Sequence, residues 1–223
     1  MRRSGSDSDA AGREGRRVAP AEFAELAGGL RETGQRQVVG ITGPPGAGKS
    51  TLASYLARSL SPAPPVVPMD GFHLAQDVIE QNGLADRKGA PDTFDAWGFV
   101  NLVARIARPT DDAVVYAPRY DRSIEEPVAG AIPISPSNGL VIVEGNYLLL
   151  ASQPWAQLND LLDLCGYVEL DDEIRRRRLI DRHVHFGKAP QAAESFVYSS
   201  DDKNAELVEA TKSRASAVVQ MDP

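Results

Sequence analysis

The sequence predicts an α/β fold, in which a mostly parallel sheet of five strands carries helices on both faces. Short apolar segments give the expected strands, at residues 37–42, 64–70, 139–144, 166–170 and 217–221. Helical spacing of apolar residues occurs between them, at residues 20–30, 51–60, 93–107, 155–162, 172–182 and 201–214. Continuous apolar strands are typical of a sheet buried on both faces, so the alternation predicts three layers.

Two stretches interrupt the alternation and are expected to be insertions. Residues 71–95 have little periodicity until Thr93 or Asp95 begins the next helix as its N-cap. Residues 117–135 contain prolines among short apolar runs, as small edge strands do. The chain has no internal repeat, so its 223 residues are expected to form one domain with these insertions.

The composition narrows the class of protein. The formal net charge is −7 and the pI is near 5.0, which argues against a nucleic-acid partner. No apolar run approaches the length of a membrane span. Residues 1–18 are polar without an apolar centre, so we expect a disordered tail and no secretory signal. Cys165 is the only cysteine, which indicates a packed core thiol in a reducing compartment, the cytoplasm.

A glycine-rich loop carries the strongest chemical signal. The segment GPPGAGKS at residues 43–50 fits the pattern G-x-x-x-x-G-K-[S/T], follows an expected strand and opens an expected helix. The backbone N–H groups of such a loop surround phosphate, and the helix N-terminus adds positive potential. Lys49 is expected to reach the β- and γ-phosphates, and Ser50 to ligate Mg²⁺. The predicted nucleotide-binding residues are Gly43, Pro44, Pro45, Gly46, Ala47, Gly48, Lys49, Ser50 and Thr51.

Two acids end expected strands near this loop. Glu144 closes the run LVIVE, where P-loop proteins place an acid near Mg²⁺, and the longer side chain of Glu suggests a contact through water. Asp70 ends another strand, at the edge of the sheet where open α/β folds bind ligands. We expect Asp70 to accept the proton of an attacking hydroxyl; capping of the turn with Gly71 is the alternative. His73 is either a wall of the substrate pocket or a structural histidine.

These segments together resemble the family of phosphoribulokinase, uridine kinase and pantothenate kinase. The resemblance is greatest to a bacterial branch of fructose-transport-system and nucleoside or nucleotide kinases. It rests on the glycine-rich loop and on four further segments, which are MDGFH at 69–73, RKGAPDTFD at 87–95, PRYD at 118–121 and VEG at 143–145.

The resemblance implies ATP and Mg²⁺ as cofactors and a small-molecule hydroxyl as acceptor. It makes Asp70 the catalytic base and places Glu144 at the metal. It also implies that Arg119, Tyr120 and Asp121 line the acceptor pocket, within the two insertions. Because the family phosphorylates sugars, nucleosides and pantothenate, the identity of the acceptor stays open, and a homodimer is possible.

An arginine-rich segment is expected to form a helical lid, at residues 178–192. Five arginines lie on an expected helix that leads into a glycine-containing turn. In kinases of this shape, lid arginines reach the transferring phosphate and stabilise the transition state. Four consecutive arginines surround a whole helical turn, so only one or two can face the nucleotide, and we predict Arg178 and Arg182. We place Arg175 and Arg176 on the solvated face; the alternative is that the arginines turned away from the nucleotide pair with Asp171, Asp172 and Glu173.

Other P-loop classes lack the motifs that they need. A GTPase would carry an Asn-Lys-x-Asp segment, which does not occur, so ATP is the expected nucleotide. A transporter or remodelling ATPase would carry a Leu-Ser-Gly-Gly signature or an Asp directly before Glu144, and the chain has neither. The sequence thus predicts an ATP- and Mg²⁺-dependent small-molecule kinase. The alternative is a P-loop ATPase or a nucleotide-binding regulator without a small-molecule acceptor.

Overall fold

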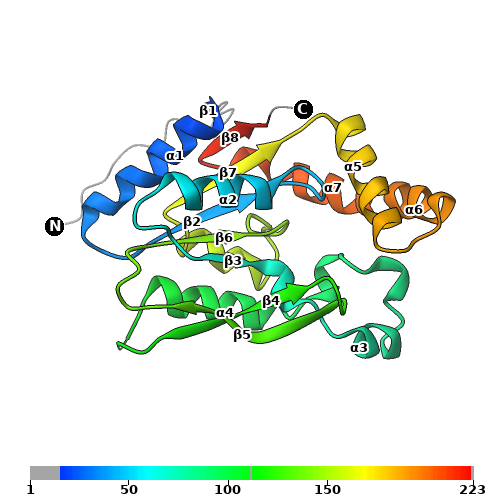
Figure 1. Cartoon of the computed structure of the whole chain (residues 1–223), viewed down its shortest axis with the longest axis horizontal. Helices are drawn as coiled ribbons and strands as arrows, with labels where there is room; N and C mark the ends of the chain where they lie inside the picture. Colours follow the sequence, from blue (N-terminus) through cyan, green and yellow to red (C-terminus); the bar gives the residue numbers. More distant parts are fainter. Residues whose placement is uncertain (1–15, 111, 222–223) are drawn as a thin grey trace.

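A parallel sheet of six strands forms the centre of the molecule (Figure 1). The computed structural model describes residues 16–110 and 112–221. The strands are β1 (Arg16–Val18), β2 (Gln37–Thr42), β3 (Val66–Pro68), β6 (Leu140–Glu144), β7 (Leu164–Glu169) and β8 (Ala217–Gln220). They lie in the order β1-β8-β7-β2-β6-β3, and every neighbouring pair is parallel. The loop that follows β2 therefore leaves the middle of the sheet.

The first strand corrects the expected extent of the N-terminal tail. We predict a disordered tail over residues 1–18 and a sheet of five strands, but Arg16–Val18 form a sixth strand that pairs with β8. Val18 is only 3% exposed. A strand of three residues with one apolar side chain has no period to detect, which is why the sequence does not reveal it. The rest of the predicted tail, residues 1–15, lies outside the described residues.

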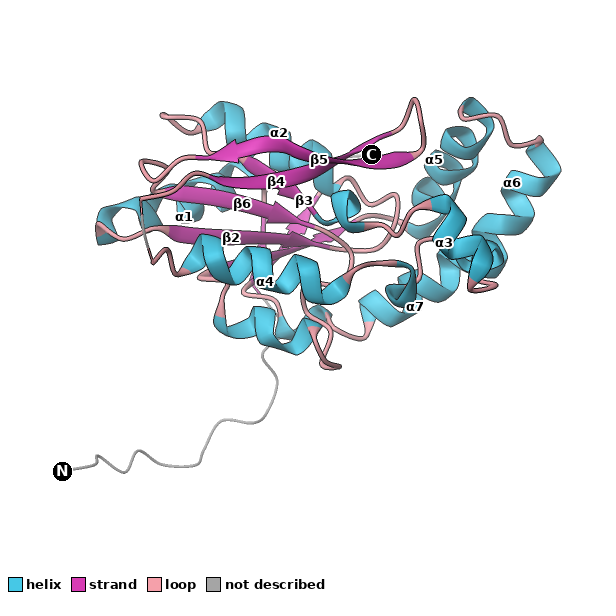
Figure 2. Cartoon of the chain, turned by 90° about the horizontal axis from the view of Figure 1, so that it is seen from below, coloured by secondary structure: helices cyan, strands magenta, loops and turns pink. Residues whose placement is uncertain are grey.

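Helices cover both faces of the sheet, as predicted (Figure 2). Those that pack closely on it are α1 (Pro20–Gly29), α2 (Lys49–Ser59) and α4 (Ala96–Ala107). Side chains alternate between the two faces along β2: Val39 packs in the core with α1 and α2, and Val38 packs in the core with α4. The expected three-layer α/β fold is confirmed.

The two insertions take different forms. The second is a separate antiparallel ribbon of β4 (Val115–Asp121) and β5 (Glu126–Ile134), so the expected edge strands are the arms of one hairpin. The first contains a short helix, α3 (Gln76–Gln81), followed by irregular turns. It ends at Asp95, whose carboxylate caps the N-terminus of α4 as predicted.

Three helices lie beyond the carboxyl ends of the strands, at the right of Figure 1. They are α5 (Asp172–His185), α6 (Pro190–Phe196) and α7 (Asp202–Glu209). The predicted lid, residues 178–192, corresponds to the second half of α5 and the start of α6. The expected long helix at 201–214 is shorter, because a π-helical turn precedes α7 and a separate turn follows it. The expected helix at 155–162 is a 3₁₀ turn.

Arg175 contradicts its predicted place on a solvated face. The side chain is 1% exposed, and its Nε donates to Asp172 Oδ1 at 2.9 Å. Its Nη2 donates to Asp202 Oδ1 at 2.6 Å, which joins α5 to α7. Arg176 is half-buried and also donates to Asp202. The ion pair with Asp172 follows from helical spacing, but the sequence could not show the burial, because the second partner, Asp202, lies on another helix.

We expect Arg175→Ala to destabilise the fold by about 2–3 kcal/mol, because it leaves Asp202 short of a buried partner. The matched control is Arg177→Ala, since Arg177 is an exposed neighbour on the same helix. We expect the control to change stability by less than about 0.5 kcal/mol. Thermal or urea unfolding measures both variants, and equal effects would contradict the role given to Arg175.

The structure bears on the expected core thiol and on the expected lack of a membrane span. Cys165 is buried, and burial raises the pKa of its thiol to about 12, which fits a packed core thiol. Over residues 16–110 and 112–221, no helix combines the length and apolar character that crossing a bilayer requires.

Candidate active site

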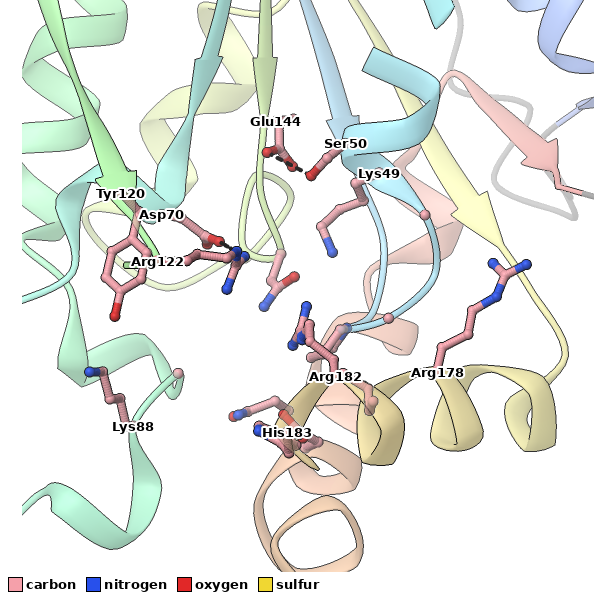
Figure 3. A pocket seen from close by; sticks show the side chains of 18 of the residues that line it. Lys49, Ser50, Asp70, Lys88, Tyr120, Arg122, Glu144, Arg178, Arg182 and His183 are labelled. Carbon is pink, nitrogen blue, oxygen red and sulfur yellow. Dashed lines mark hydrogen bonds and ion pairs between the residues drawn. The ribbon is translucent and has the colours of Figure 1, made fainter. Parts of the chain in front are cut away.

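A cavity of about 540 Å³ lies where the strands of the sheet end. Its walls come from parts of the chain that are far apart in sequence: the phosphate loop, the turn after β3, both insertions, the end of β6 and the lid helices. Figure 3 shows side chains from these elements pointing toward one another. The topology explains the convergence, because the carboxyl ends of parallel strands lie at one edge of the sheet.

The phosphate loop joins β2 to α2, as predicted. Gly48 has a φ of 100°, a left-handed conformation that lets the chain turn from the loop into α2. Six of the nine predicted nucleotide-binding residues line the cavity: Pro45, Gly46, Gly48, Lys49, Ser50 and Thr51. The other three, Gly43, Pro44 and Ala47, belong to the loop without lining the cavity.

Lys49 is buried inside the loop. Its Nζ donates to Pro44 O at 3.0 Å, and the residue is 9% exposed. Burial lowers the pKa of Lys49 to about 8, against the opposite pull of the Glu144 and Asp70 carboxylates. A negatively charged ligand in the loop would offset the cost of burying this charge.

Ser50 and Glu144 are in direct contact. Ser50 Oγ donates to Glu144 Oε1 at 3.1 Å, and Glu144 ends the buried strand β6. Burial, and then the charge of Asp70, raise the pKa of Glu144 to about 7. A cation bound nearby would stabilise the ionised form of this buried carboxylate. Among the residues that the structure describes, no group of three or more His, Cys, Asp or Glu side chains is placed to hold a metal ion.

Asp70 lies across the cavity from Ser50 and Glu144, on the turn that follows β3 (Figure 3). Its Oδ2 accepts from Arg122 Nη2 at 3.3 Å, and its side chain is 38% exposed. A Cβ on Gly71 would lie 2.6 Å from Pro118 O, so only glycine lets β4 pass this close to the turn. That close approach is what brings the hairpin to Asp70.

The hairpin corrects two predicted substrate residues. Tyr120 lines the cavity as expected, but Arg119 and Asp121 do not. Arg122, the first residue of the turn that follows β4, lines the cavity together with Tyr120. Asp121 instead accepts hydrogen bonds from the backbone and hydroxyl of Ser123. No sequence pattern pointed to Arg122, because it lies in the turn one residue beyond the PRYD segment.

His73 forms part of the cavity wall. Its Nδ1 donates to Asp70 O at 2.9 Å, and its ring lies 4.0 Å from the ring of Phe94 and 5.1 Å from that of Tyr120. Burial lowers the pKa of His73, so the ring is neutral near pH 7. With the proton held on Nδ1, Nε2 is left as an acceptor.

The two predicted lid arginines both line the cavity but at different places. Arg182 faces the Asp70 side, while Arg178 lies on the other side of the phosphate loop (Figure 3). Arg178 Nη1 lies 4.0 Å from where a Cβ on Gly48 would be, beside Met221. Burial lowers the pKa of Arg182, and within the described residues no carboxylate pairs with it. A partly exposed guanidinium without an ion-pair partner is suited to an anionic ligand.

Sequence reasoning also missed several groups around the cavity. Asp201 lines the cavity and does not cap α7; its carboxylate lies 2.8 Å from His183 Nε2 on the lid. Asn204, on α7, also lines the cavity. No periodicity gave a signal for the remaining groups, which include Phe196 at the end of α6 and, from turns and loops, Lys88, Glu125, Asn146 and Met221.

The fold and this site define a P-loop nucleotide-binding protein. The glycine-rich loop between β2 and α2, with an acid at the end of neighbouring β6, is the arrangement that binds phosphate and Mg²⁺ in this class. Comparison with known proteins then gives the family. A family model described as an AAA domain matches residues 39–198.

Three known proteins illustrate the relationship. "Putative uridine kinase C227.14" of Schizosaccharomyces pombe is 35% identical over 179 residues, which are 76% of this chain and 75% of that protein. A crystal structure described as a "putative fructose transport system kinase" from Silicibacter sp. TM1040 has a TM-score of 0.77 at 35% identity, and covers 90% of this chain and 98% of its own. Pantothenate kinase of Enterococcus faecalis is 28% identical over 151 residues, 65% of this chain and 48% of that protein. The chain belongs to the P-loop kinase family of uridine and pantothenate kinases.

Proposed function

We propose that this chain transfers the γ-phosphoryl group of ATP to a hydroxyl group of a small metabolite. One observation carries the proposal: Asp70 opens into the same cavity as Lys49 and Ser50 of the phosphate loop (Figure 3). A hydroxyl beside Asp70 would face a phosphate bound on the loop, as in-line transfer requires. The kinase names of the relatives support the same reaction class.

The phosphate loop is the proposed nucleotide site. Backbone N–H groups of residues 43–51 would hold the phosphates, and Lys49 would exchange its bond to Pro44 O for the β- and γ-oxygens. Ser50 and, through water, Glu144 would hold Mg²⁺. When bound, the ion neutralises charge on the phosphate oxygens. The missing guanine-binding segment supports ATP as the nucleotide.

Asp70 is the proposed general base. Its carboxylate takes the hydroxyl proton while the acceptor oxygen forms a bond to the γ-phosphorus. The bond from the γ-phosphorus to the β,γ-bridging oxygen breaks, and its electron pair leaves on ADP. Tyr120 and His73 would form the wall that positions the acceptor, and their aromatic contact supports that pairing.

Arg182 is the proposed cation for the transferring phosphate, and the geometry gives Arg178 a different role. We expect Arg182→Ala to lower kcat by about two to three orders of magnitude with little change in stability. Because Arg178 lies on the far side of the loop from Asp70, we expect Arg178→Ala mainly to raise the KM for ATP, by about tenfold. Steady-state kinetics with varied ATP separates these effects.

The control for both lid variants is Arg177→Ala, which removes an exposed arginine from the same helix and should leave both constants unchanged. If this control lowers kcat as far as Arg182→Ala does, the helix acts as a diffuse positive field. That result would contradict the separate roles of Arg178 and Arg182.

Acceptor-dependent release of ADP tests the proposed function. The purified protein with ATP and Mg²⁺ is given sugars, nucleosides, hydroxy acids and pantothenate in turn. We expect one acceptor class to raise ADP release well above the rate with ATP alone. A rate that no acceptor changes would point instead to an ATPase or a regulator.

A further inference from the structure

Arg122 lies at the acceptor end of the cavity and is poorly satisfied there. Its only ion pair within the described residues is with Asp70, at 3.3 Å between Nη2 and Oδ2. Its guanidinium carbon also lies 5.8 Å from the centre of the Tyr120 ring and 5.9 Å from that of the Phe186 ring on the lid. The side chain is 44% exposed. A long, single ion pair on an exposed side chain leaves the guanidinium free to take a better partner.

The ion pair with Arg122 engages the carboxylate of Asp70, the proposed catalytic base. The Oδ2 atom of Asp70 accepts a hydrogen bond from Arg122, and that bond competes with the uptake of a hydroxyl proton by the same atom. For Asp70 to work as a base at that oxygen, the guanidinium has to move to another anion. Glu125, the carboxylate of the same hairpin that lines the cavity, is already engaged: its Oε2 accepts from Tyr120 at 3.0 Å and lies 3.8 Å from Lys88 Nζ.

Lys88 makes this end of the cavity more positive. Its loop is fixed by two hydrogen bonds at Gly89: Tyr147 donates to the carbonyl at 2.5 Å, and the N–H donates to Thr93 Oγ1 at 2.9 Å. Lys88 Nζ donates to Gln76 Oε1 at 3.0 Å. Over the whole cavity, five cations (Lys49, Lys88, Arg122, Arg178 and Arg182) face four carboxylates (Asp70, Glu125, Glu144 and Asp201).

We propose that the acceptor carries an oxyanion, a carboxylate or a phosphate, in addition to its reacting hydroxyl, and that Arg122 binds that group. This inference rests on the proposed kinase function. The acceptor's anion draws Arg122 off Asp70, with Lys88 adding to the positive field. The freed carboxylate then takes the hydroxyl proton, the acceptor oxygen bonds to the γ-phosphorus, and ADP leaves with the electron pair of the broken bond. A neutral acceptor offers Arg122 no partner, so Asp70 stays paired.

Matched acceptors test the inference on the unmodified protein. The carboxylate arm compares glycerate with glycerol and pantothenate with pantothenol. The phosphate arm compares fructose 6-phosphate with fructose and ribulose 5-phosphate with ribulose. In at least one arm we expect the anionic member to have a kcat/KM about 100-fold higher, as a charge-assisted bidentate contact provides. The arm that responds identifies the anion.

Arg122→Gln supplies a second readout, because it removes the charge and keeps hydrogen-bonding capacity. We expect kcat/KM for the preferred anionic acceptor to fall by about 10- to 100-fold, mainly through KM. Turnover of the matched neutral acceptor should stay the same or rise, because Asp70 is no longer paired. A merely structural role for Arg122 would lower both. Arg119→Gln is the control: Arg119 lies on β4 of the same hairpin but does not line the cavity, so the variant should change neither.

The outcomes distinguish this inference from the function on which it rests. If neutral acceptors are phosphorylated as well as their anionic partners, or better, the oxyanion inference is overturned and the kinase assignment stands. An Arg122→Gln variant that loses both activities equally also overturns it. If no acceptor raises ADP release above the rate with ATP alone, the kinase proposal fails, and the inference fails with it.

Discussion

Replacing Asp70 with asparagine is expected to lower kcat by about two to four orders of magnitude. Asparagine keeps the shape of the side chain and can still accept from Arg122, but its amide oxygen cannot take the proton of a hydroxyl. Affinity for ATP should hardly change, because the phosphate loop is a separate element across the cavity. Single-turnover kinetics, with ATP binding measured separately, gives both quantities.

Asp121→Asn is the matched control for Asp70. Asp121 is the last residue of β4, in the hairpin beside the site. Its carboxylate accepts hydrogen bonds from Ser123 and does not line the cavity. We expect this variant to keep its kcat. If Asp70→Asn also keeps a near-normal kcat, Asp70 only holds the turn at Gly71 and the hairpin that packs on it.

Lys49→Ala is expected to abolish phosphoryl transfer and to weaken ATP binding. The ammonium group is the compact charge that the loop supplies to the β- and γ-oxygens. The fold should survive. Burial lowers the pKa of Lys49 to about 8, so at pH 7 the buried charge costs stability, and its removal relieves that cost. Calorimetric ATP titration and thermal unfolding of the variant check both statements.

Lys203→Ala serves as the control for Lys49, since Lys203 is exposed on α7 and lies outside the cavity. It should bind ATP and turn over normally. Unchanged turnover in Lys49→Ala would end the P-loop kinase assignment. Unfolding of that variant would instead show that the buried Nζ and its bond to Pro44 O stabilise the loop.

The sheet and the phosphate site were predictable because each depends on contiguous residues. Residues 37–42 and 139–144 are continuous apolar runs, and burial on both faces demands such runs. Lys49 and Ser50 belong to one loop whose spacing fixes their roles. Strand β1 was not predicted, because it is held in place by its pairing with β8 and three residues are too few to show a period-two pattern.

The acceptor end was harder to predict because it depends on register and on distant partners. The ribbon of β4 and β5 has an irregularity between Ala117 and Arg119, and this sets which side chains after it face the cavity. Tyr120 and Arg122 face it, while Arg119 does not. Arg175 shows the same limit, because its burial depends on Asp202, which lies 27 residues further along the chain.

Transfer of label from γ-³²P ATP tests the central claim most directly. The protein is incubated with the acceptor that best stimulates ADP release, and the labelled products are separated. We predict that the label appears on the acceptor in equal amount to the ADP formed, and that Asp70→Asn removes this product. Label found only in inorganic phosphate, with ADP formed at the same rate without acceptor, would contradict the assignment of this chain as a small-molecule kinase.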